Sequence, residues 1–320
     1  MIKKVLLKPI QKFVQIESLS GMLLFAATLI AIIWANSPFG YLYESLWEYE
    51  WGINTTYKFE IVKPLILWVN DGLMALFFFL IGLEIKRELL IGELNSVRKA
   101  TLPMIAAIGA MIVPVAVYLL FNPSPETSSG WGIPMATDIA FSLAILQLLG
   151  RRVPLSLKIF LTAFAIVDDL GAVMVIAFFY SGAIKWMFLL YAFILLSILF
   201  YLSYRQLYSK YACRVLGMIM GALFLKSRIH PTIAGILVAF SVPVRQKIDV
   251  STYTEQLSDI VDKLRRTDGT PRPILTDNQI GYIDNLEDWT FRVQSPLQRL
   301  EHQLHGWVAY IIIPIFAFAN

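Results

Sequence analysis

The chain has few of the residues that build disulfides, metal clusters and charged surfaces. Its single cysteine, Cys213, excludes an intrachain disulfide and a zinc cluster built on thiolates. Charged residues make up only 16% of the 320 residues, whereas hydrophobic residues make up 57%. This composition is more apolar than that of soluble domains of similar length, so the sequence indicates an integral membrane protein.

Apolar stretches of membrane-spanning length recur along the chain from Leu19 onward. A span needs about 20 mainly apolar residues to cross the hydrocarbon layer. We therefore predict an all-α polytopic membrane protein, with a membrane domain of about eight helices over residues 1–246. The expected helices cover residues 18–36, 64–86, 100–121, 131–150, 154–180, 184–204, 211–226, 230–246 and 305–320.

The basic residues follow a membrane topology and do not form a nucleic-acid site, although the net charge is +4. Lys3, Lys4 and Lys12 precede the first expected helix, and further bases follow the second, fourth and sixth. The positive-inside rule then places the N-terminus in the cytoplasm. The first apolar run has no small-residue cleavage site after it, so it is not a cleaved signal. We expect membrane lipid as a partner, with no nucleic acid and no cofactor.

One segment breaks the membrane pattern, because the chain turns polar from about Lys247 to Arg299. Within it, the charged stretch from Asp249 to Arg266 has a helical pattern. We interpret residues 247–299 as a cytoplasmic insertion and residues 300–320 as the start of a further membrane helix. Loops of this length are either functional or tolerated insertions, and tolerated insertion is the simpler interpretation. On the outer side, the aromatic and β-branched stretch from Glu44 to Ile61 is predicted to fold as a small hairpin.

An adjacent pair of carboxylates, Asp168 and Asp169, lies inside the apolar run from Leu155 to Tyr180. A charge at mid-bilayer depth costs at least a few kcal/mol, so it persists where it faces a polar cavity. Two like charges this close cannot both ionise freely, and paired carboxylate oxygens also suit a small cation. Competition between protons and a cation for one site, exposed alternately to two sides, produces exchange. The alternative is that both acids are structural, held by hydrogen bonds or a buried base.

A third acid, Asp138, follows Gly132, Pro134 and Thr137 within an apolar run. The glycine and proline predict a helix that is unwound near its centre. Broken helices expose backbone groups to a cavity, and opposed half-helix ends supply partial charges that hold ions. A structural role is the alternative for Asp138 as well.

Two other classes of membrane protein compete with an ion exchanger. A sodium-coupled solute symporter would need polar side chains for an organic substrate, and the central runs offer little besides Thr137, Ser142 and Thr162. An aspartate-rich prenyl transferase would need a second acidic cluster, but the residues after Asp169 are apolar. Intramembrane aspartyl proteases carry their two acids on separate helices. We therefore expect a transporter and not an enzyme.

Several strings resemble the bacterial NhaA-type sodium/proton antiporters. They are FLIGLEIKREL, IPMATDIAFSLAIL, KIFLTAFAIVDDLGAV, the run from His230 to Gly235, and LEHQLHGWVAYIIIPIFAFAN. The resemblance runs from Ser20 to Asn320 apart from the polar insertion. It implies an inverted-repeat fold with discontinuous helices, of which this family is itself a type example. It also implies a protein of the bacterial inner membrane that exchanges cytoplasmic Na+ or Li+ for external protons and serves sodium and pH homeostasis. A homodimer is the assembly that we consider for it.

The resemblance assigns roles to the acids. Asp169 would be the principal ligand of Na+, and Asp168 would share cation and proton binding. Thr137 and Asp138 would lie at the crossing of the broken helices, where Asp138 offsets partial charges. Activity would rise towards alkaline pH, because protons must leave the pair before a cation binds.

A pH-sensing cluster would lie at the cytoplasmic funnel of such a transporter. The resemblance places in it the residues Glu84, Lys86, Arg87, Glu88, His230 and Glu301. The stretch from Glu84 to Glu88 taken alone would be interpreted as an anchor at the membrane edge. Histidine as a residue type changes charge near neutral pH, but we expect His302 and His305 in a solvated loop.

The end of the chain departs from the family pattern. After His305 only about 15 residues remain, which would span roughly 22 Å as a helix and fall short of a bilayer. The family continues with three further helices that carry the second repeat. We therefore expect the C-terminal repeat to be missing, and an inactive fragment of the antiporter is an alternative to a working exchanger.

Overall fold

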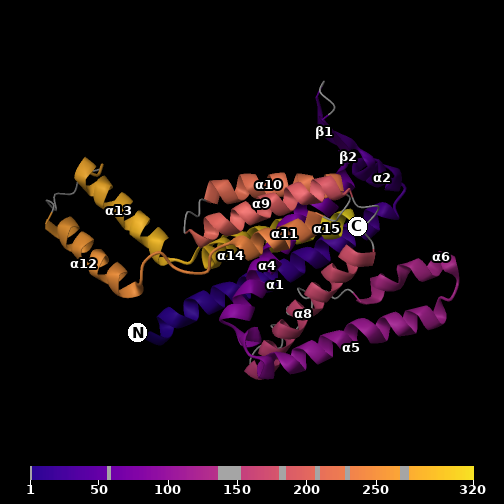
Figure 1. Cartoon of the computed structure of the whole chain (residues 1–320), viewed down its shortest axis with the longest axis horizontal. Coiled ribbons are helices and arrows are strands. Elements are labelled where there is room, and N and C mark those ends of the chain that lie inside the picture. The colour runs from indigo at the N-terminus through magenta and orange to yellow at the C-terminus, as the bar shows by residue number, and fades with distance from the viewer. Residues whose placement is uncertain are drawn as a thin grey trace.

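Helices dominate the computed structural model of the chain, which describes residues 2–55, 59–135, 153–179, 185–205, 210–227, 231–266 and 274–320. Figure 1 shows most of them side by side in one elongated bundle, with one helical pair projecting from an end. The first half of the chain forms α1 (Ile2–Ala35), α2 (Gly40–Glu48), β1 (Glu50–Thr55), β2 (Phe59–Pro64), α3 (Leu65–Leu67), η1 (Trp68–Leu73), α4 (Met74–Leu90), η2 (Glu93–Asn95), α5 (Val97–Phe121), α6 (Pro125–Ser128) and η3 (Ser129–Met135). The second half forms α8 (Leu155–Phe179), α9 (Trp186–Tyr204), α10 (Lys210–Ser227), α11 (Pro231–Ser241), α12 (Val250–Arg266), α13 (Asp277–Val293), α14 (Pro296–Trp307), η5 (Val308–Ile312) and α15 (Ile313–Ala319).

Four helices within the described residues are long and apolar enough to cross a membrane. They cover Leu65–Leu90, Ala100–Phe121, Trp186–Tyr204 and Pro296–Ala319, and a fifth candidate is the pair Leu19–Ala35 and Gly40–Glu48, bent by 112°. The apolar side chains of α5 point outward, since Ile105 and Ile112 are more than half exposed. A surface of this kind is stable in lipid and unfavourable in water. The fold is thus mostly helical, as an all-α membrane transporter requires.

The stretch after α2 folds as the predicted hairpin. Strands β1 and β2 pair antiparallel, with Glu50 opposite Pro64 and Ile53 opposite Ile61. The hairpin therefore begins and ends a few residues later than expected, because Gly40–Glu48 is helical. It adds a two-stranded sheet to a protein that we predicted to be all-α. Figure 1 shows it at the end of the bundle where the C-terminus lies.

Several predicted helices have different bounds in the structure. The first, expected over 18–36, begins at Ile2. The helix expected over 64–86 continues to Leu90 and contains the π-helical turn η1. The helix expected over 230–246 ends at Ser241, because the next residue precedes Pro243 and is disfavoured in the α region. Of the helix expected over 131–150, residues 131–135 form part of the 3-10 helix η3, and the rest lies outside the described residues.

The last helix corrects a sequence-based prediction. It begins at Pro296 instead of near residue 305, with Ser295 in an extended conformation as its N-cap. Proline suits the first helical turn, where its missing N–H has no partner to lose. From Pro296 to Ala319 the helix has 24 residues, or about 36 Å. The prediction that this helix is too short to cross a bilayer was therefore wrong. The first half of this helix is polar, so a search for apolar residues did not locate its start.

The polar segment is helical and not a loop. Helix α12 covers the charged stretch in which a helical pattern was recognised, and α13 was not predicted. A capping box of Thr276 and Gln279 starts α13. The hydroxyls of Tyr253 and Thr290 lie 3.0 Å apart and join the two helices. Figure 1 shows the pair projecting from the end of the bundle at which α1 begins.

The tightest helix contact in the bundle is between α4 and α11. A Cβ on Gly82 would lie 2.7 Å from the Ala239 side chain, and one on Gly235 would meet the carbonyl oxygen of Ala75. Glycine allows two helices to approach this closely. The contacts advance along both helices in the same direction, so α4 and α11 run parallel. This crossing holds together the elements that carry the charged residues discussed next.

Candidate functional site

Asp168 is buried in the middle of α8. Its side chain is 1% exposed, and it is the one acid among the most fully buried side chains of the described residues. Asp169 follows it on the same helix, and its side chain lies outside the described residues. Adjacent positions on a helix differ by about 100° in direction. The structure therefore buries one member of the predicted pair.

The neighbours of α8 explain how Asp168 becomes buried. Helix α5 packs along α8, and the Met111 side chain fills the space that a Cβ on Gly171 would take. On another side, Ala163 and Val167 of α8 belong to a core cluster with Ile81 and Ile85 of α4. The segment with the aspartates is thus held between α4 and α5. Gly171 thus permits α5 and α8 to approach each other closely.

Three predicted site residues cannot be placed against this pair. Thr137, Asp138 and His230 lie outside the described residues. The described part of the run that leads to Thr137 is the 3-10 helix η3, which contains Pro134. The tighter 3-10 form is typical of sequences that depart from regular α-helix.

The structure brings three residues of the predicted pH-sensing cluster together. Arg87 on α4 donates to Glu301 on α14 at 2.5 Å and to the neighbouring Glu88 at 3.0 Å. The Glu301 and Glu88 side chains are 14% and 16% exposed, so both acceptors are largely withdrawn from solvent. Glu84 lies one helical turn before Glu88 on α4 and is half-buried. The cluster therefore joins two helices that are far apart in the sequence.

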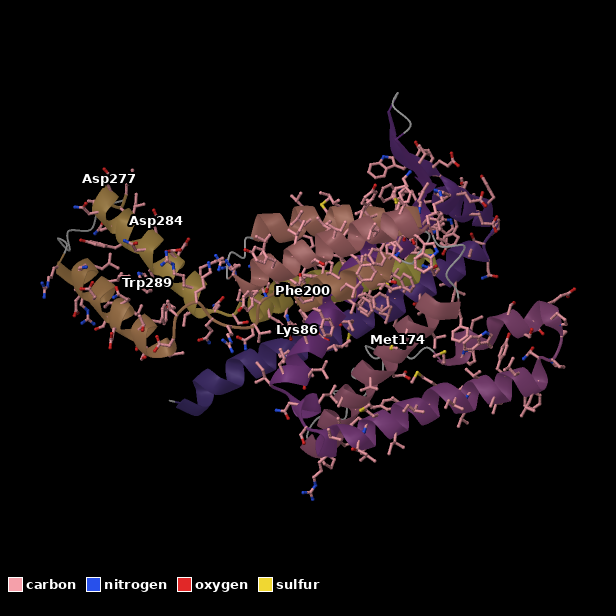
Figure 2. The ribbon with its side chains drawn as sticks, viewed as in Figure 1. Lys86, Met174, Phe200, Asp277, Asp284 and Trp289 are labelled. Atoms are coloured by element: carbon pink, nitrogen blue, oxygen red, sulfur yellow. The ribbon has the colours of Figure 1, made fainter. Side chains whose placement is uncertain are left out.

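Lys86 belongs to the same stretch but makes a different kind of contact. Its ammonium donates to the carbonyl oxygens of Phe240 at 2.6 Å and Val242 at 2.5 Å, at the end of α11. Figure 2 labels this side chain inside the bundle. Both of these hydrogen-bond acceptors of Lys86 are backbone oxygens and not carboxylates.

The two histidines near the cluster are helical. His302 and His305 both lie in α14 and not in a solvated loop as expected. His302 is exposed, whereas His305 is half-buried on another side of the helix. The expectation of a loop failed because the helix begins at Pro296.

A further ion pair lies at the opposite end of α4 and includes Asp71 of η1. Its carboxylate accepts from Lys63 of β2 at 2.9 Å, within the π-helical turn η1. Asn70 in the same turn exchanges side-chain hydrogen bonds of 3.0 and 2.9 Å with Asn320. The presence of an acid in an apolar helix was the signal in the sequence. Its partner Lys63 lies in the hairpin, and the spacing of the two residues in the sequence did not indicate an ion pair.

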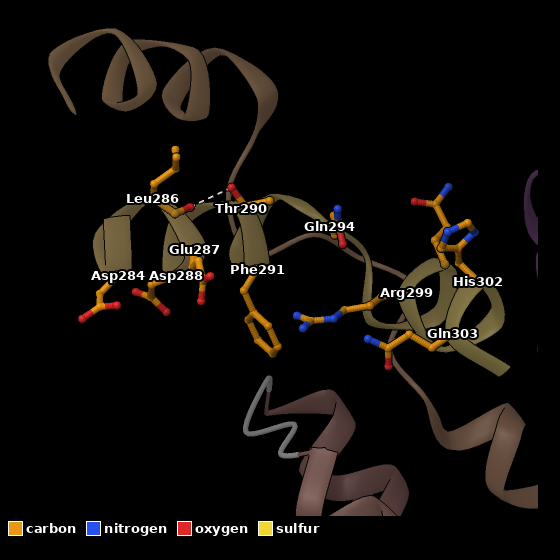
Figure 3. Close-up of a pocket in the computed structure, with 11 residues that line it drawn as sticks. Asp284, Leu286, Glu287, Asp288, Thr290, Phe291, Gln294, Arg299, His302 and Gln303 are labelled. Atoms are coloured by element: carbon orange, nitrogen blue, oxygen red, sulfur yellow. Dashed lines mark hydrogen bonds between the residues drawn. The ribbon is translucent and has the colours of Figure 1, made fainter. Parts of the chain in front are cut away.

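An open cavity of about 990 Å³ lies where α13 meets α14. Figure 3 shows acidic residues of α13 along one part of it and Arg299 and His302 of α14 along another. The Arg299 guanidinium lies 4.1 Å from the centre of the Phe291 ring, a cation–π contact that fixes the elbow between the helices. Asp168 and Arg87 do not line this cavity.

Comparison with known proteins identifies the family. The model of the Na+/H+ antiporter 1 family matches residues 11–320. The chain belongs to this family. It is 46% identical over 316 residues to the Na(+)/H(+) antiporter NhaA of Oleidesulfovibrio alaskensis, which covers 98% of this chain and 70% of that relative.

Two further relatives give the same result. The Na(+)/H(+) antiporter NhaA 1 of Saccharophagus degradans is 44% identical, over 98% of this chain and 68% of its own length. The Na(+)/H(+) antiporter NhaA of Bacteroides fragilis is also 44% identical, over 98% of this chain and 73% of its own length. The resemblance recognised in the sequence is therefore confirmed.

Proposed function

We propose that this protein exchanges cytoplasmic Na+ for external protons across the bacterial inner membrane. The observation that carries the proposal is the burial of Asp168, next to Asp169, in an apolar helix of a chain from the Na+/H+ antiporter 1 family. An ionisable side chain at this depth is a functional site by default, because its insertion is costly. The names of the relatives support the same pair of ions.

The carboxylate pair accounts for coupling between the two ions. Asp169 serves as the principal cation ligand and Asp168 shares cation and proton binding. Carboxylate oxygens are hard ligands that suit Na+ and also Li+, and the same oxygens cannot hold a proton and a cation at once. A site that opens alternately to each side then moves one species in each direction. Activity rises with pH, because protons must first leave the pair.

The surrounding fold completes the proposed mechanism. Thr137 and Asp138 would lie at the crossing of discontinuous helices in an inverted-repeat architecture, with Asp138 offsetting the partial charges of helix ends. The N-terminus and the 247–299 segment face the cytoplasm, and the chain assembles in lipid with a homodimer as its expected oligomer. In support of this topology, α1 begins at the end of the bundle from which α12 and α13 project (Figure 1).

We assign pH sensing to the cluster around Arg87, with Glu84, Lys86, Glu88, Glu301 and His230 as its members. The contacts from Arg87 to Glu301 and Glu88 support this role, since they connect two helices through ionisable groups. Protonation of either acid weakens the connection. The charge state at this end of α4 can then change how α4 and α14 sit against each other.

Sodium-dependent proton flux in everted membrane vesicles tests the proposal. The full-length gene product is compared with Asp168→Asn and Asp169→Asn at pH 7 and 8.5, and with Asp284→Asn, an exposed acid on α13, as the matched control. We expect flux to be lost in the first two variants and kept in the third. An asparagine removes the charge and preserves the volume. Flux that persists in Asp169→Asn would reject the site, and flux that requires an organic solute would favour a symporter.

A further inference from the structure

Helix α11 ends inside the protein, where water cannot complete its hydrogen bonds. Ser241, its last residue, is 3% exposed and Val242 is fully buried. The last four carbonyl groups of a helix lack partners within the helix and must find them elsewhere. Pro243 follows, and it has no backbone N–H to donate to these carbonyls. The sequence therefore creates a buried helix end with unpaired acceptors.

The partners come from two sources. Within the chain segment itself, the Ser241 hydroxyl donates to the Val238 carbonyl at 2.6 Å, and the Val242 N–H donates to the Ala239 carbonyl at 3.1 Å. The carbonyls of Phe240 and Val242 receive hydrogen bonds from the Lys86 ammonium of α4, at 2.6 and 2.5 Å. A positive charge is favourable at a helix C-terminus, which carries partial negative charge. Lys86 thus acts as the cap that α11 cannot supply.

The cap also sets the register of the two helices. Gly82, one turn before Lys86, lies against Ile236 and Ala239 of α11. Gly82 and Gly235 contribute no side chain that would interlock the two helices at these positions. A charged hydrogen bond to fixed backbone oxygens opposes sliding of one helix along the other, because the acceptors cannot move without the helix.

Lys86 stands between the two charged parts of the candidate site. Its neighbour Arg87 binds Glu301. Phe240, whose carbonyl accepts from Lys86, packs in the core cluster that contains Val167, the residue before Asp168. A displacement of the α11 end would therefore reach the aspartate helix through direct side-chain packing.

We propose that Lys86 is a positioning residue: it caps the buried end of α11, and in this way holds the segment with Asp168 in place relative to the Arg87–Glu301 contact. Its part in ion exchange rests on the function proposed above, whereas its part as a helix cap does not. This role differs from that of an ion-pair partner in a pH sensor, because the acceptors of Lys86 do not titrate.

Several charged groups share the helices and turns packed around Lys86. They are Glu84, Arg87 and Glu88 on α4, Asp71 on η1, Glu93 on η2, Arg299, Glu301, His302 and His305 on α14, and Lys158, Asp168 and Asp169 on α8. Helix α11 itself has no charged residue between Pro231 and Ser241. Loss of the Lys86 charge would make the nearby carboxylates bind protons more strongly. The pH profile of exchange should then move towards alkaline pH.

The test uses Lys86→Met, which keeps a flexible chain without charge, and Lys86→Arg, which keeps charge and donors. Lys247→Met is the matched control, since Lys247 is exposed and follows α11. Hydrogen exchange of the backbone amides of residues 237–242 reports the cap, and sodium-dependent flux between pH 6.5 and 9 reports positioning. If Lys86→Met does not accumulate in the membrane, Lys86→Gln replaces it as a neutral side chain with two N–H donors.

In Lys86→Met we expect exchange of these amides to accelerate by about tenfold or more, as for a lost charged hydrogen bond. We also expect the pH of half-maximal flux to rise by roughly 0.5 to 1 unit. Lys86→Arg should restore both and Lys247→Met should change neither. Unchanged amide exchange in Lys86→Met would overturn the cap. Faster amide exchange with an unchanged pH profile would overturn the positioning role. If amide exchange is faster in Lys86→Met but even the wild-type protein shows no sodium-dependent flux, the helix cap is retained and the proposed function is rejected.

Discussion

Arg87 on α4 and Glu301 on α14, 214 residues apart in the sequence, are joined by an ion pair of 2.5 Å. The contact closes one end of the bundle, and the same arginine also binds Glu88. Next to it, Lys86 binds the end of α11. Two consecutive basic residues on one helix thus hold two other helices.

Replacing Arg87 with Gln should destabilise the protein by about 1 to 2 kcal/mol. The Arg87 side chain is 37% exposed, so solvent weakens the ion pair. The Glu301 carboxylate, however, would lose its partner at a position where little water can replace it. Thermal unfolding in detergent measures the change. Arg245→Gln, an exposed base near the end of α11, is the control and should have no effect. A double variant with Glu301→Gln should recover part of the loss, and a fully additive double variant would show that the two residues do not interact.

Gly235→Ala should destabilise the bundle by about 1 to 3 kcal/mol, because the new methyl group would collide with the backbone of α4. The Ala75 carbonyl and the Phe79 N–H, which lies 3.0 Å from the added carbon, cannot move aside as a flexible side chain could. Gly221→Ala in α10 is the matched control. Nothing lies within 4 Å of its added carbon, so it should stabilise its helix by about 0.5 to 1 kcal/mol. Equal unfolding temperatures for the two variants would contradict the close crossing.

Asp71→Asn should loosen the hairpin without unfolding the helix that carries η1. The Lys63–Asp71 pair is partly exposed, so its loss should cost less than about 1 kcal/mol overall. The hairpin also keeps the hydrogen bond from the Trp68 indole to the Trp51 carbonyl, at 2.7 Å. Limited proteolysis should show faster cleavage within the hairpin. Exchanging the charges, with Lys63→Asp and Asp71→Lys together, should restore resistance, whereas each single reversal should not.

Asp249 should titrate at a lower pH than an ordinary aspartate. The hydroxyls of Ser251 and Thr252 donate to its carboxylate and lower its pKa, since both favour the charged form. A group whose pKa is lowered by folding stabilises the folded state above its unfolded pKa. That contribution is lost as the pH falls through the folded value. We therefore expect the start of α12 to fray only in acid, below about pH 4. Carboxyl-carbon NMR on the labelled protein measures the midpoint, and Ser251→Ala should raise it.

The sequence predicted the parts of the fold that follow from hydrophobicity. Apolar runs located most membrane helices, and aromatic and β-branched residues indicated the hairpin. It missed the start of α14, because the residues from Gln298 to Gln303 are polar on one side of the helix. A prediction based on continuous apolar residues therefore began the helix only after them. It also missed α13, whose charged surface looked like a loop.

The candidate site was predictable where the signal was a charge in an apolar run, as for Asp168, or a family string, as for Arg87 and Glu301. The partners of Lys86 were not predictable. Its acceptors are carbonyl oxygens, which every residue has, and only the place where α11 ends makes those two available. Backbone acceptors leave no mark in the composition of a sequence.

The π-helical turn η1 divides the helix from Leu65 to Leu90 into two parts that face different neighbours. A π-turn holds one more residue than an α-turn, so side chains beyond it are rotated by about 100° from the positions that regular counting gives. The part before α4 can thus face the hairpin and the end of α15, while the part after it faces α11 and α14. A single stripe of apolar residues cannot serve both. Spacing between Asp71 and Glu84 counted in regular turns would therefore assign one of them to the wrong side of the helix.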